Sequence, residues 1–295
     1  MGTTKYKALA LDLDGTLMDS NKKLSDVNKQ AIWAAIDAKI AVILASGRPL
    51  FGVQPVAQLL ELEKRGGFIL AYNGGNIWDC KAHRLVYKKE IPSNCITNIC
   101  EVAKEFDVAP LTYYEDKIIS EKAHDEYVIK EAFCNNAEVI QIDDIPAFVD
   151  YPVAKLLIVG EHKKLLPARD KLLNLNGNEL DIFFSEDYFL EIVPKNIRKD
   201  ASIDTLLLHL GIRQSELIAC GDGLNDISMI QYAGLGIAMK NAYSDVKEIA
   251  DYIAPSNDEN GVAEVIKKFI LEKIGKGCCT KRDFTTVLAI YKYYK

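Results

Sequence analysis

The sequence predicts an α/β protein with a doubly wound, mainly parallel sheet and an inserted α+β module. Apolar strand-like runs alternate with helix-like segments at both ends of the chain, and this rhythm stops near residue 85 and returns near residue 199. The length of 295 residues exceeds one ordinary core. We therefore expect a core of residues 1–84 and 190–274, an inserted module of residues 85–189, and an extension, residues 275–295, to which we assign no role.

The first half of the core shows strands and helices in alternation. Residues 6–11 predict a short buried strand, and Ser25 precedes an amphipathic segment that we expect to be a serine-capped helix. The apolar run 40–46 predicts a second strand, residues 50–62 a helix, and residues 68–75 a third strand. Strands joined through helices pair in parallel with right-handed crossovers, as in a doubly wound sheet.

The middle of the chain mixes helices with hairpin-like strands, which indicates a separate α+β module. The strands expected there are residues 84–92, 109–114, 117–120, 154–160, 180–185 and 189–194, and the helices include 93–106 and 125–133. The α/β rhythm then returns, with strands at 217–223, 235–239 and 252–254 and helices at 201–212, 225–233, 242–250 and 261–274.

Composition and charge exclude several classes of protein. The chain has 36 basic and 42 acidic residues and a net charge of −6, which argues against broad nucleic-acid binding. No apolar stretch approaches the length of a membrane span. The seven cysteines form no CxxC pair and the four histidines are scattered, so neither a zinc site nor a histidine-based triad is expected. We expect a cytoplasmic monomer or small homo-oligomer without nucleic-acid or membrane partners.

Polar residues follow four of the predicted core strands. Ligands of doubly wound folds bind beyond the carboxyl ends of the strands, where these residues fall. Each group alone has an ordinary explanation as a turn or a helix cap. Lys199 adds a positive charge at a helix start. The four groups are Asp12, Asp14 and Thr16; Ser46, Gly47 and Arg48; Asn73 and Gly74; and Asp222, Asn225 and Asp226.

Together these groups suit phosphoryl chemistry. Asp12 and Asp14 stand two residues apart at the end of one strand, and two such carboxylates repel unless a cation or a reaction employs both. Carboxylates from two strand ends form an oxygen-rich site suited to Mg²⁺. Lysine and hydroxyl groups can then hold phosphoryl oxygens. Asp12 could act as a nucleophile while Asp14 keeps a proton for a leaving group.

The motifs DLDGTL, ASGRP, Lys199 and GDGLND, in this order, resemble the four motifs of the haloacid dehalogenase superfamily. The place and length of the insertion, and YNGG before it, resemble the Cof-type subfamily of capped sugar phosphatases (type IIB). The similarity spans residues 5–273. It implies that the inserted module is a cap that supplies specificity, and that the protein hydrolyses a phosphate ester of a small metabolite, most simply a sugar phosphate.

The resemblance also implies a role for each matching residue. Asp12 attacks phosphorus to form an aspartyl-phosphate, and Asp14 protonates the departing oxygen and then deprotonates the hydrolytic water. Mg²⁺ is held by Asp12, the backbone carbonyl of Asp14 and Asp222, with Asp226 as ligand or support. The phosphate-binding residues implied are Thr16, Ser46, Gly47, Lys199 and Asn225, and the substrate-binding candidates are Arg48, Asn73 and Gly74.

Three alternatives remain open from the sequence. A phosphomutase would use the same aspartyl-phosphate and return the phosphoryl group to its substrate. A dehalogenase would need neither Asp14 nor the metal, so the presence of Asp14 and GDGLND counts against it. A non-catalytic phosphate-binding protein would have lost one of the acids or the lysine, and all of them are present.

Overall fold

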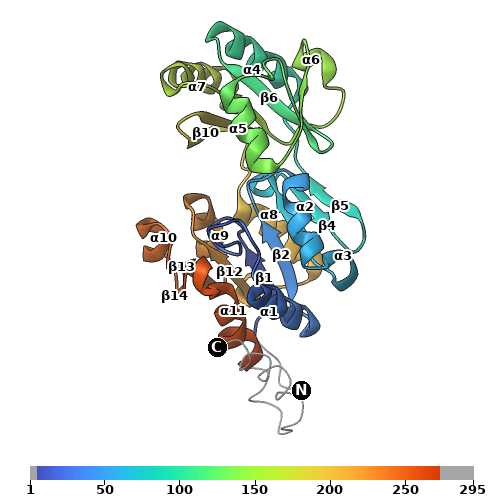
Figure 1. Cartoon of the computed structure of the whole chain (residues 1–295), viewed down its shortest axis with the longest axis vertical. Helices are drawn as coiled ribbons and strands as arrows, with labels where there is room; N and C mark the ends of the chain where they lie inside the picture. The colour runs from blue at the N-terminus through green and yellow to red at the C-terminus, as the bar shows by residue number, and fades with distance from the viewer. Residues whose placement is uncertain (1–4, 273–295) are drawn as a thin grey trace. The chain divides into compact units, whose positions relative to one another are not determined.

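The computed structural model describes residues 5–272 and confirms the predicted fold class, an α/β protein with a mainly parallel sheet and a second, α+β sheet (Figure 1). The extension 275–295 lies outside the described residues. The chain divides into two compact units. The first is the described part of Met1–Ile43 and Gly211–Lys295, and the second is Leu44–Leu210. The predicted limits of the insertion, residues 85 and 189, stay a prediction.

The first unit is built on parallel strands in the order β14-β13-β12-β1. Most of their residues are fully buried and apolar, as expected for strands covered on both faces. The strands are β1 (Ala8–Leu11), β12 (Leu217–Gly221), β13 (Leu235–Met239) and β14 (Tyr252–Ala254). The helices are α1 (Asp26–Asp37), α9 (Ile227–Tyr232), α10 (Ser244–Glu248) and α11 (Gly261–Ile266), which continues as a π-helical turn (Lys267–Leu271).

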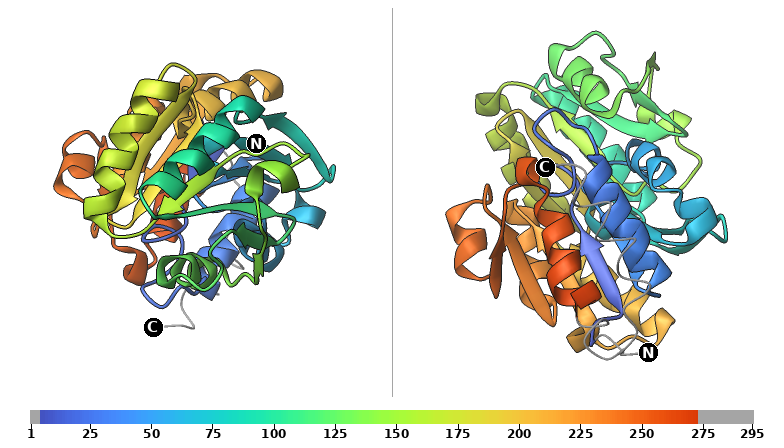
Figure 2. Two further views of the ribbon diagram at one scale, coloured as in Figure 1. Left: turned by 90° about the horizontal axis from the view of Figure 1, so that it is seen from above. Right: turned by 60° about the horizontal axis from the view of Figure 1, so that its bottom comes forward.

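The predicted serine cap of α1 is confirmed, because Ser25 Oγ accepts a hydrogen bond of 3.1 Å from the backbone N–H of Asn28. Helices α1 and α11 lie side by side (Figure 2). The buried Asn28 joins them: its Oδ1 accepts from the N–H of Ala263 at 3.0 Å, and its Nδ2 donates to the carbonyl of Leu17. The loop after β1 is thereby tied to the C-terminal helix.

Strand β2 (Ala41–Ala45) crosses from the first unit into the second. At its start, Ala41 N–H donates to the carbonyl of Lys7, just before β1. In the second unit the antiparallel strands β3 (Phe68–Ala71), β4 (Asn76–Asp79) and β5 (Arg84–Lys88) follow one another. The helices of this part are α2 (Leu50–Leu59), α3 (Leu62–Arg65) and α8 (Lys199–Leu210).

In two elements of this part, left-handed residues end the element earlier than the sequence pattern predicts. The strand expected over 68–75 stops at Ala71, because Asn73 (φ 54°) and Gly74 (φ 110°) turn the chain through a 3₁₀ turn, Tyr72–Gly74. The helix expected over 50–62 stops at Leu59, because Glu61 has a φ of 56° and separates α2 from α3. Apolar pattern alone does not reveal such left-handed residues.

The rest of the second unit is a six-stranded sheet with the order β10-β11-β9-β6-β7-β8. Its strands are β6 (Ala109–Tyr114), β7 (Lys117–Ser120), β8 (Val139–Gln141), β9 (Leu156–Val159), β10 (Leu180–Glu186) and β11 (Phe189–Pro194). Its helices are α4 (Ser93–Glu105), α5 (Glu126–Asn135), α6 (Ile145–Phe148) and α7 (His162–Asn176).

The two faces of the six-stranded sheet differ. On one face Leu156, Ile158 and Ile192 belong to an apolar core that they share with residues of α4, α6 and α7. On the other face α5 lies against β6, because Tyr113 OH donates a 2.6 Å hydrogen bond to Glu131 of α5 (Figure 1). Side chains alternate along a strand, so Lys155, Leu157 and Glu191 share this second face.

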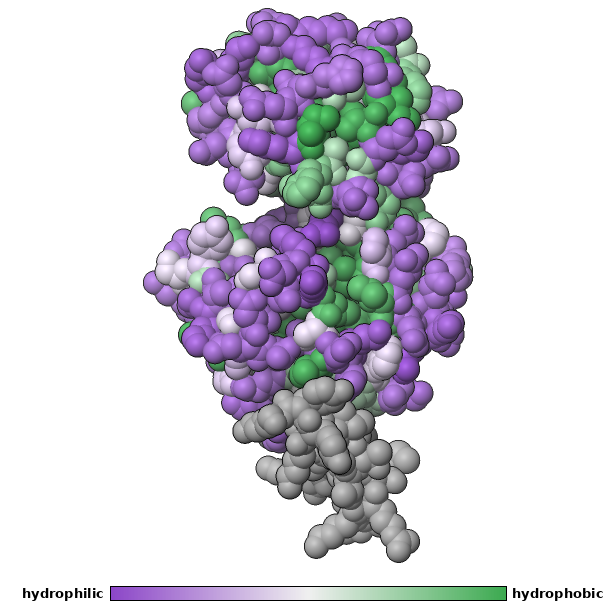
Figure 3. All heavy atoms as spheres, in the orientation of Figure 1, coloured by the Kyte–Doolittle hydropathy of each residue, from purple (hydrophilic) through white to green (hydrophobic). Residues whose placement is uncertain are grey.

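The surface is mostly polar. Hydrophilic residues cover most of the visible face in Figure 3, with hydrophobic residues gathered in patches between them. None of the helices between residues 5 and 272 combines the length and the apolar composition that crossing a membrane requires. No disulfide bond joins the cysteines that the structure describes, and Cys134 is the exposed one among them.

Candidate active site

The ends of β1 and β12 bring two aspartates together in the first unit. The strands pair in parallel up to Leu11 and Cys220, and Asp12 N–H donates to the carbonyl of Cys220 at 3.0 Å. Asp12 follows β1 directly and is buried, and Asp222 follows β12 directly. Neighbouring parallel strands therefore place these two residues at the same edge.

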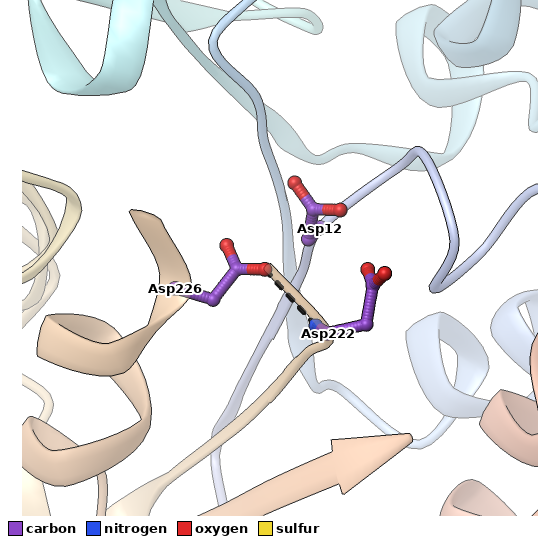
Figure 4. Close-up of side chains that lie close together, drawn as sticks. All are labelled: Asp12, Asp222 and Asp226. Atoms are coloured by element: carbon purple, nitrogen blue, oxygen red, sulfur yellow. Dashed lines mark hydrogen bonds between the residues drawn. The ribbon is translucent and has the colours of Figure 1, made fainter. Parts of the chain in front are cut away.

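Asp226 completes a group of three carboxylates with Asp12 and Asp222. One oxygen of each lies within 4.8 Å of the other two (Figure 4). Asp226 is fully buried, and its Oδ2 accepts the backbone N–H groups of Asp222 and Gly223, both at 3.0 Å. These bonds fix the loop after β12. Thr16 Oγ1 donates to Asp222 Oδ1 at 2.8 Å and holds that carboxylate from the β1 side.

The three carboxylates fit a hard divalent cation. Like charges at this spacing repel one another, and two of the three side chains are at least nine-tenths buried, so a cation would remove a large electrostatic cost. All the donors are oxygen atoms, which Mg²⁺ prefers to sulfur or imidazole ligands. The cluster is thus suited to the predicted metal.

Gly15 lies directly beside this cluster. Its φ of +79° is in the left-handed region, and a Cβ atom at this position would lie 2.2 Å from Asp222 Oδ2. Asn241 Nδ2 donates to the carbonyl of Gly15 at 2.7 Å and so helps to fix the loop. The backbone of the DLDGTL loop therefore approaches the metal-binding candidates more closely than a side chain would allow.

Asp14 points to a different partner. Its carboxylate forms a 2.5 Å ion pair with Lys22 Nζ, and its side chain is about one-third exposed. It is not among the three clustered carboxylates. Asn225 is exposed, with its side chain next to Gly223. The sequence analysis did not identify Lys22 or Asn241.

The second unit gathers the predicted phosphate-binding and substrate-binding residues that follow β2 and β3. Ser46 N–H donates to Leu70 and the Ser46 carbonyl accepts from Asn73 N–H, both at 2.9 Å. Ser46 Oγ accepts from the backbone N–H of Arg48 at 3.2 Å. A Cβ atom on Gly47 would lie 3.2 Å from the Asn73 amide, so the Asn73 side chain covers Gly47. Ser46, Gly47, Arg48 and Asn73 form one loop cluster.

Lys199 joins the same region from the start of α8. It is 1% exposed, the largest fully buried side chain of the described chain, and its Nζ donates to the carbonyl of Ala45 at 2.9 Å. An ammonium group is rarely buried to this extent unless it serves a charged partner. The carbonyl of Ala45 holds it beside Ser46.

Ser202, one turn further along α8, fixes the turn after β3. Its Oγ donates to the carbonyl of Gly74 at 2.8 Å, and a Cβ atom on Gly74 would lie 2.4 Å from that oxygen. Asp200 Oδ2 accepts from the guanidinium of Arg198 at 2.9 Å. Sequence reasoning did not find Ser202, since a serine inside a predicted helix carries no signal of a distant partner.

Fold and site together describe an α/β protein with a centre built on aspartates. Comparison with known proteins makes this specific: the family of haloacid dehalogenase-like hydrolases matches residues 9–266. The chain is 31% identical over 269 residues to the 5-amino-6-(5-phospho-D-ribitylamino)uracil phosphatase YcsE of Bacillus subtilis (strain 168), covering 90% of this chain and 96% of that protein.

Solved structures agree with the family match. A haloacid dehalogenase-like hydrolase from Bacteroides thetaiotaomicron superposes with a TM-score of 0.86 at 42% identity, over 89% of this chain and 99% of that one. A subclass IIB sugar phosphatase, 24% identical, shares the fold with a TM-score of 0.72, over 89% of this chain and 98% of that one. The chain belongs to the haloacid dehalogenase-like hydrolase family, and the resemblance inferred from its motifs is confirmed.

Proposed function

We propose that this protein uses Mg²⁺ to hydrolyse the phosphate monoester of a small hydroxylated metabolite, such as a sugar phosphate, through an aspartyl-phosphate on Asp12. That it is a phosphomonoesterase follows from its family and from its phosphatase relatives. The metal, the substrate class, the mechanism and a cytoplasmic location are the proposal. The observation that carries it is the cluster of Asp12, Asp222 and Asp226 at two adjacent strand ends.

The metal would be held by Asp12, the backbone carbonyl of Asp14 and Asp222, with Asp226 as a further ligand or support. When bound, Mg²⁺ neutralises carboxylate and phosphate charge and polarises the phosphoryl oxygens. The protein contributes the fixed positions of these ligands. Thr16 orients Asp222, and Asp226 orders the loop that carries Asp222.

In the first step an Asp12 carboxylate oxygen forms a bond to phosphorus while the bond from phosphorus to the ester oxygen breaks. Asp14, in its acid form, gives its proton to that departing oxygen, so an alcohol leaves. The division of roles fits the structure, because Asp12 is buried within the carboxylate cluster whereas the Asp14 side chain is partly exposed and outside it.

In the second step a water oxygen forms a bond to phosphorus as the bond to the Asp12 oxygen breaks. Asp14, now a carboxylate, takes the proton of the water, and inorganic phosphate is released. Asp12 and Asp14 return to their starting states. The cycle consumes one ester and one water and needs no other reactant.

Ser46 and Lys199 would bind the phosphoryl oxygens that Asp12 does not face. The buried Nζ of Lys199 and the Oγ of Ser46 carry donor protons, and the carbonyl of Ala45 and the loop of Gly47 hold both groups in place. Thr16 and Asn225 are the further phosphate-binding candidates, and Arg48, Asn73 and Gly74 are candidates for contact with the rest of the substrate.

The substrate class is proposed as hydroxylated phosphate esters that include open-chain polyols. The support is the 31% identical relative, whose name identifies a phosphorylated ribityl chain as its substrate. A sugar phosphate and a ribityl phosphate share the same chemistry, namely one phosphoryl group on a short chain of hydroxyl-bearing carbons.

The direct test measures phosphate release from a panel of phosphorylated metabolites with and without Mg²⁺, for wild type and for Asp12→Asn. We expect release that needs the metal and that falls by several orders of magnitude in the variant, which retains the shape of Asp12 but not its nucleophilic charge. Full activity of Asp12→Asn would exclude Asp12 as the nucleophile. An isomerised phosphate ester without free phosphate would indicate a phosphomutase.

A further inference from the structure

Where α5 lies against the second face of the six-stranded sheet, five polar residues gather that the mechanism above does not use. We name them the cap-face cluster: Tyr113 of β6, Glu131 and Asn135 of α5, Lys155 just before β9, and Glu191 of β11. Tyr113, Glu131, Lys155 and Glu191 are each at least nine-tenths buried. Buried charged residues are uncommon in proteins unless they are paired or serve a ligand.

Hydrogen bonds and an ion pair join most of the polar atoms of this cluster, but not all of them. Tyr113 OH donates to Glu131 Oε1 at 2.6 Å, and Asn135 Nδ2 donates to the same oxygen at 2.8 Å. Lys155 Nζ pairs with Glu191 Oε1 at 3.0 Å. Burial raises the pKa of Glu131 above its usual range, and the nearby charge of Lys155 opposes this rise. The five side chains therefore form one coupled polar group.

Two acceptor atoms of the cluster are left over. Glu191 Oε2 and Asn135 Oδ1 are buried and have no hydrogen-bond partner among residues 5–272. A buried acceptor without a donor costs roughly 1–3 kcal/mol, and more when it is charged. Both atoms accept hydrogen bonds, so the missing partner must be a group that donates them.

The cluster adjoins the phosphate-binding loop of the second unit. The ring of Tyr113 lies 6.0 Å from that of Phe51 and 5.7 Å from that of Tyr72, measured between centroids. A Cβ atom on Gly52 would lie 2.9 Å from Asn135 Oδ1. Phe51 and Gly52 lie in the first turn of α2, which follows the loop that carries Ser46, and Tyr72 precedes Asn73. The unpartnered Asn135 oxygen thus lies close to the residues that we assign to phosphate binding.

We propose that the cap-face cluster binds the hydroxyl groups of the leaving group, and so selects phosphate esters of polyols or sugars. Glu191 Oε2 and Asn135 Oδ1 accept hydrogen bonds from substrate hydroxyls, while Lys155 Nζ donates to a hydroxyl oxygen. A hydroxyl group both donates and accepts, which matches this mixed set, whereas an apolar leaving group would leave the two buried acceptors unpaired. The inference rests on the proposed function and names the residues that select its substrate.

The test compares three phosphate esters on wild type and on Glu191→Gln. The probes are ribose phosphate, deoxyribose phosphate esterified at the same terminal hydroxyl, and p-nitrophenyl phosphate, which has no hydroxyl group. We expect Glu191→Gln to raise the KM for ribose phosphate roughly tenfold or more, since a charge-assisted hydrogen bond is lost. The kcat/KM for p-nitrophenyl phosphate should not change, because the core chemistry is intact.

A second variant and a matched control separate binding from folding. Asn135→Ala removes the other unpartnered acceptor and should likewise raise the KM for ribose phosphate alone. Glu121→Gln is the control, because Glu121, directly after β7, is another mostly buried carboxylate but accepts from the N–H of Ile145, a residue of the apolar core on the opposite face. This control should leave the ratio of kcat/KM between ribose phosphate and p-nitrophenyl phosphate unchanged.

Three results would overturn the inference. The first is that Glu191→Gln lowers kcat/KM equally for all three esters. The second is a KM for ribose phosphate that neither variant changes. The third is a change in selectivity of the same size in Glu121→Gln. If the wild type releases no phosphate from any of the three esters with Mg²⁺, the proposed function is wrong instead. Calorimetric binding of ribose phosphate to wild type and to Glu191→Gln then decides the inference by itself, with equal affinities rejecting it.

Discussion

At the residue scale, Gly15 shows why the loop beside the carboxylate cluster requires a glycine. The residue has a positive φ and lies where a Cβ atom would collide with Asp222 Oδ2. The turn after Asp14 was predictable from Gly-Thr following a strand. The contact with Asp222 was not, because it joins residues far apart in the sequence. The same holds for Ser202 beside Gly74.

Replacing Gly15 by alanine should damage activity more than stability. The left-handed conformation costs a non-glycine residue about 1–2 kcal/mol, and displacement of Asp222 should lower kcat/KM on the order of a hundredfold. The control is Gly211→Ala, since Gly211 has a φ of +66° but a Cβ atom there would meet no other atom within 4 Å. Urea unfolding and phosphate release separate the two effects. Equal activity in the two variants would contradict this account.

At the element scale, the starts of β1 and β12 are locked together by Glu216. Its carboxylate pairs with Lys7 Nζ at 2.8 Å and with Arg213 at 3.1 Å, and it accepts the backbone N–H of Arg213. The apolar pattern predicted both strands, and the parallel pairing placed Asp12 and Asp222 at one edge. The ion pairs and the hydrogen bond of Glu216, at the opposite edge of these strands, could not be predicted from the apolar pattern.

Glu216 should make the stability of the fold sensitive to acid. The hydrogen bonds from Arg213 and Lys7 lower the pKa of Glu216 from its usual 4.5 to about 2. The carboxylate form therefore stabilises the fold fully above the unfolded pKa, and this contribution is lost as the pH falls from about 5 to about 2. Glu216→Gln should be less stable than wild type at neutral pH, and the difference should shrink in acid. Urea unfolding across this range tests it; a difference independent of pH would contradict the assignment.

At the scale of the whole molecule, the order of motifs along the chain carried most of the prediction. It indicated the fold class and the family, both of which are confirmed, and it pointed to strand ends whose side chains meet within each unit. The order of motifs could not predict the cap-face cluster. Tyr113, Glu131 and Lys155 come from separate elements, and their closeness follows from the register of the six-stranded sheet and the packing of α5 against it rather than from any local pattern.

Metal binding should stabilise the folded protein through the carboxylate cluster. A cation present at roughly a hundred times its Kd adds about 2.7 kcal/mol to the free energy of unfolding. Asp222→Asn should abolish this gain, and without metal it should be no less stable than wild type, because one of three neighbouring negative charges is gone. Thermal unfolding with and without Mg²⁺ measures both effects. An undiminished Mg²⁺ shift in the variant would place the cation elsewhere.

The central claim is the aspartyl-phosphate on Asp12, and its most direct test uses Asp14→Asn with p-nitrophenyl phosphate. The nitrophenolate leaves without needing a proton, whereas hydrolysis of the intermediate needs the base that the variant lacks. The account predicts a burst of one nitrophenol per enzyme, then slow turnover, with a phosphoryl group on the peptide that contains Asp12. Steady phosphate release with no burst and an unmodified Asp12 peptide would contradict it.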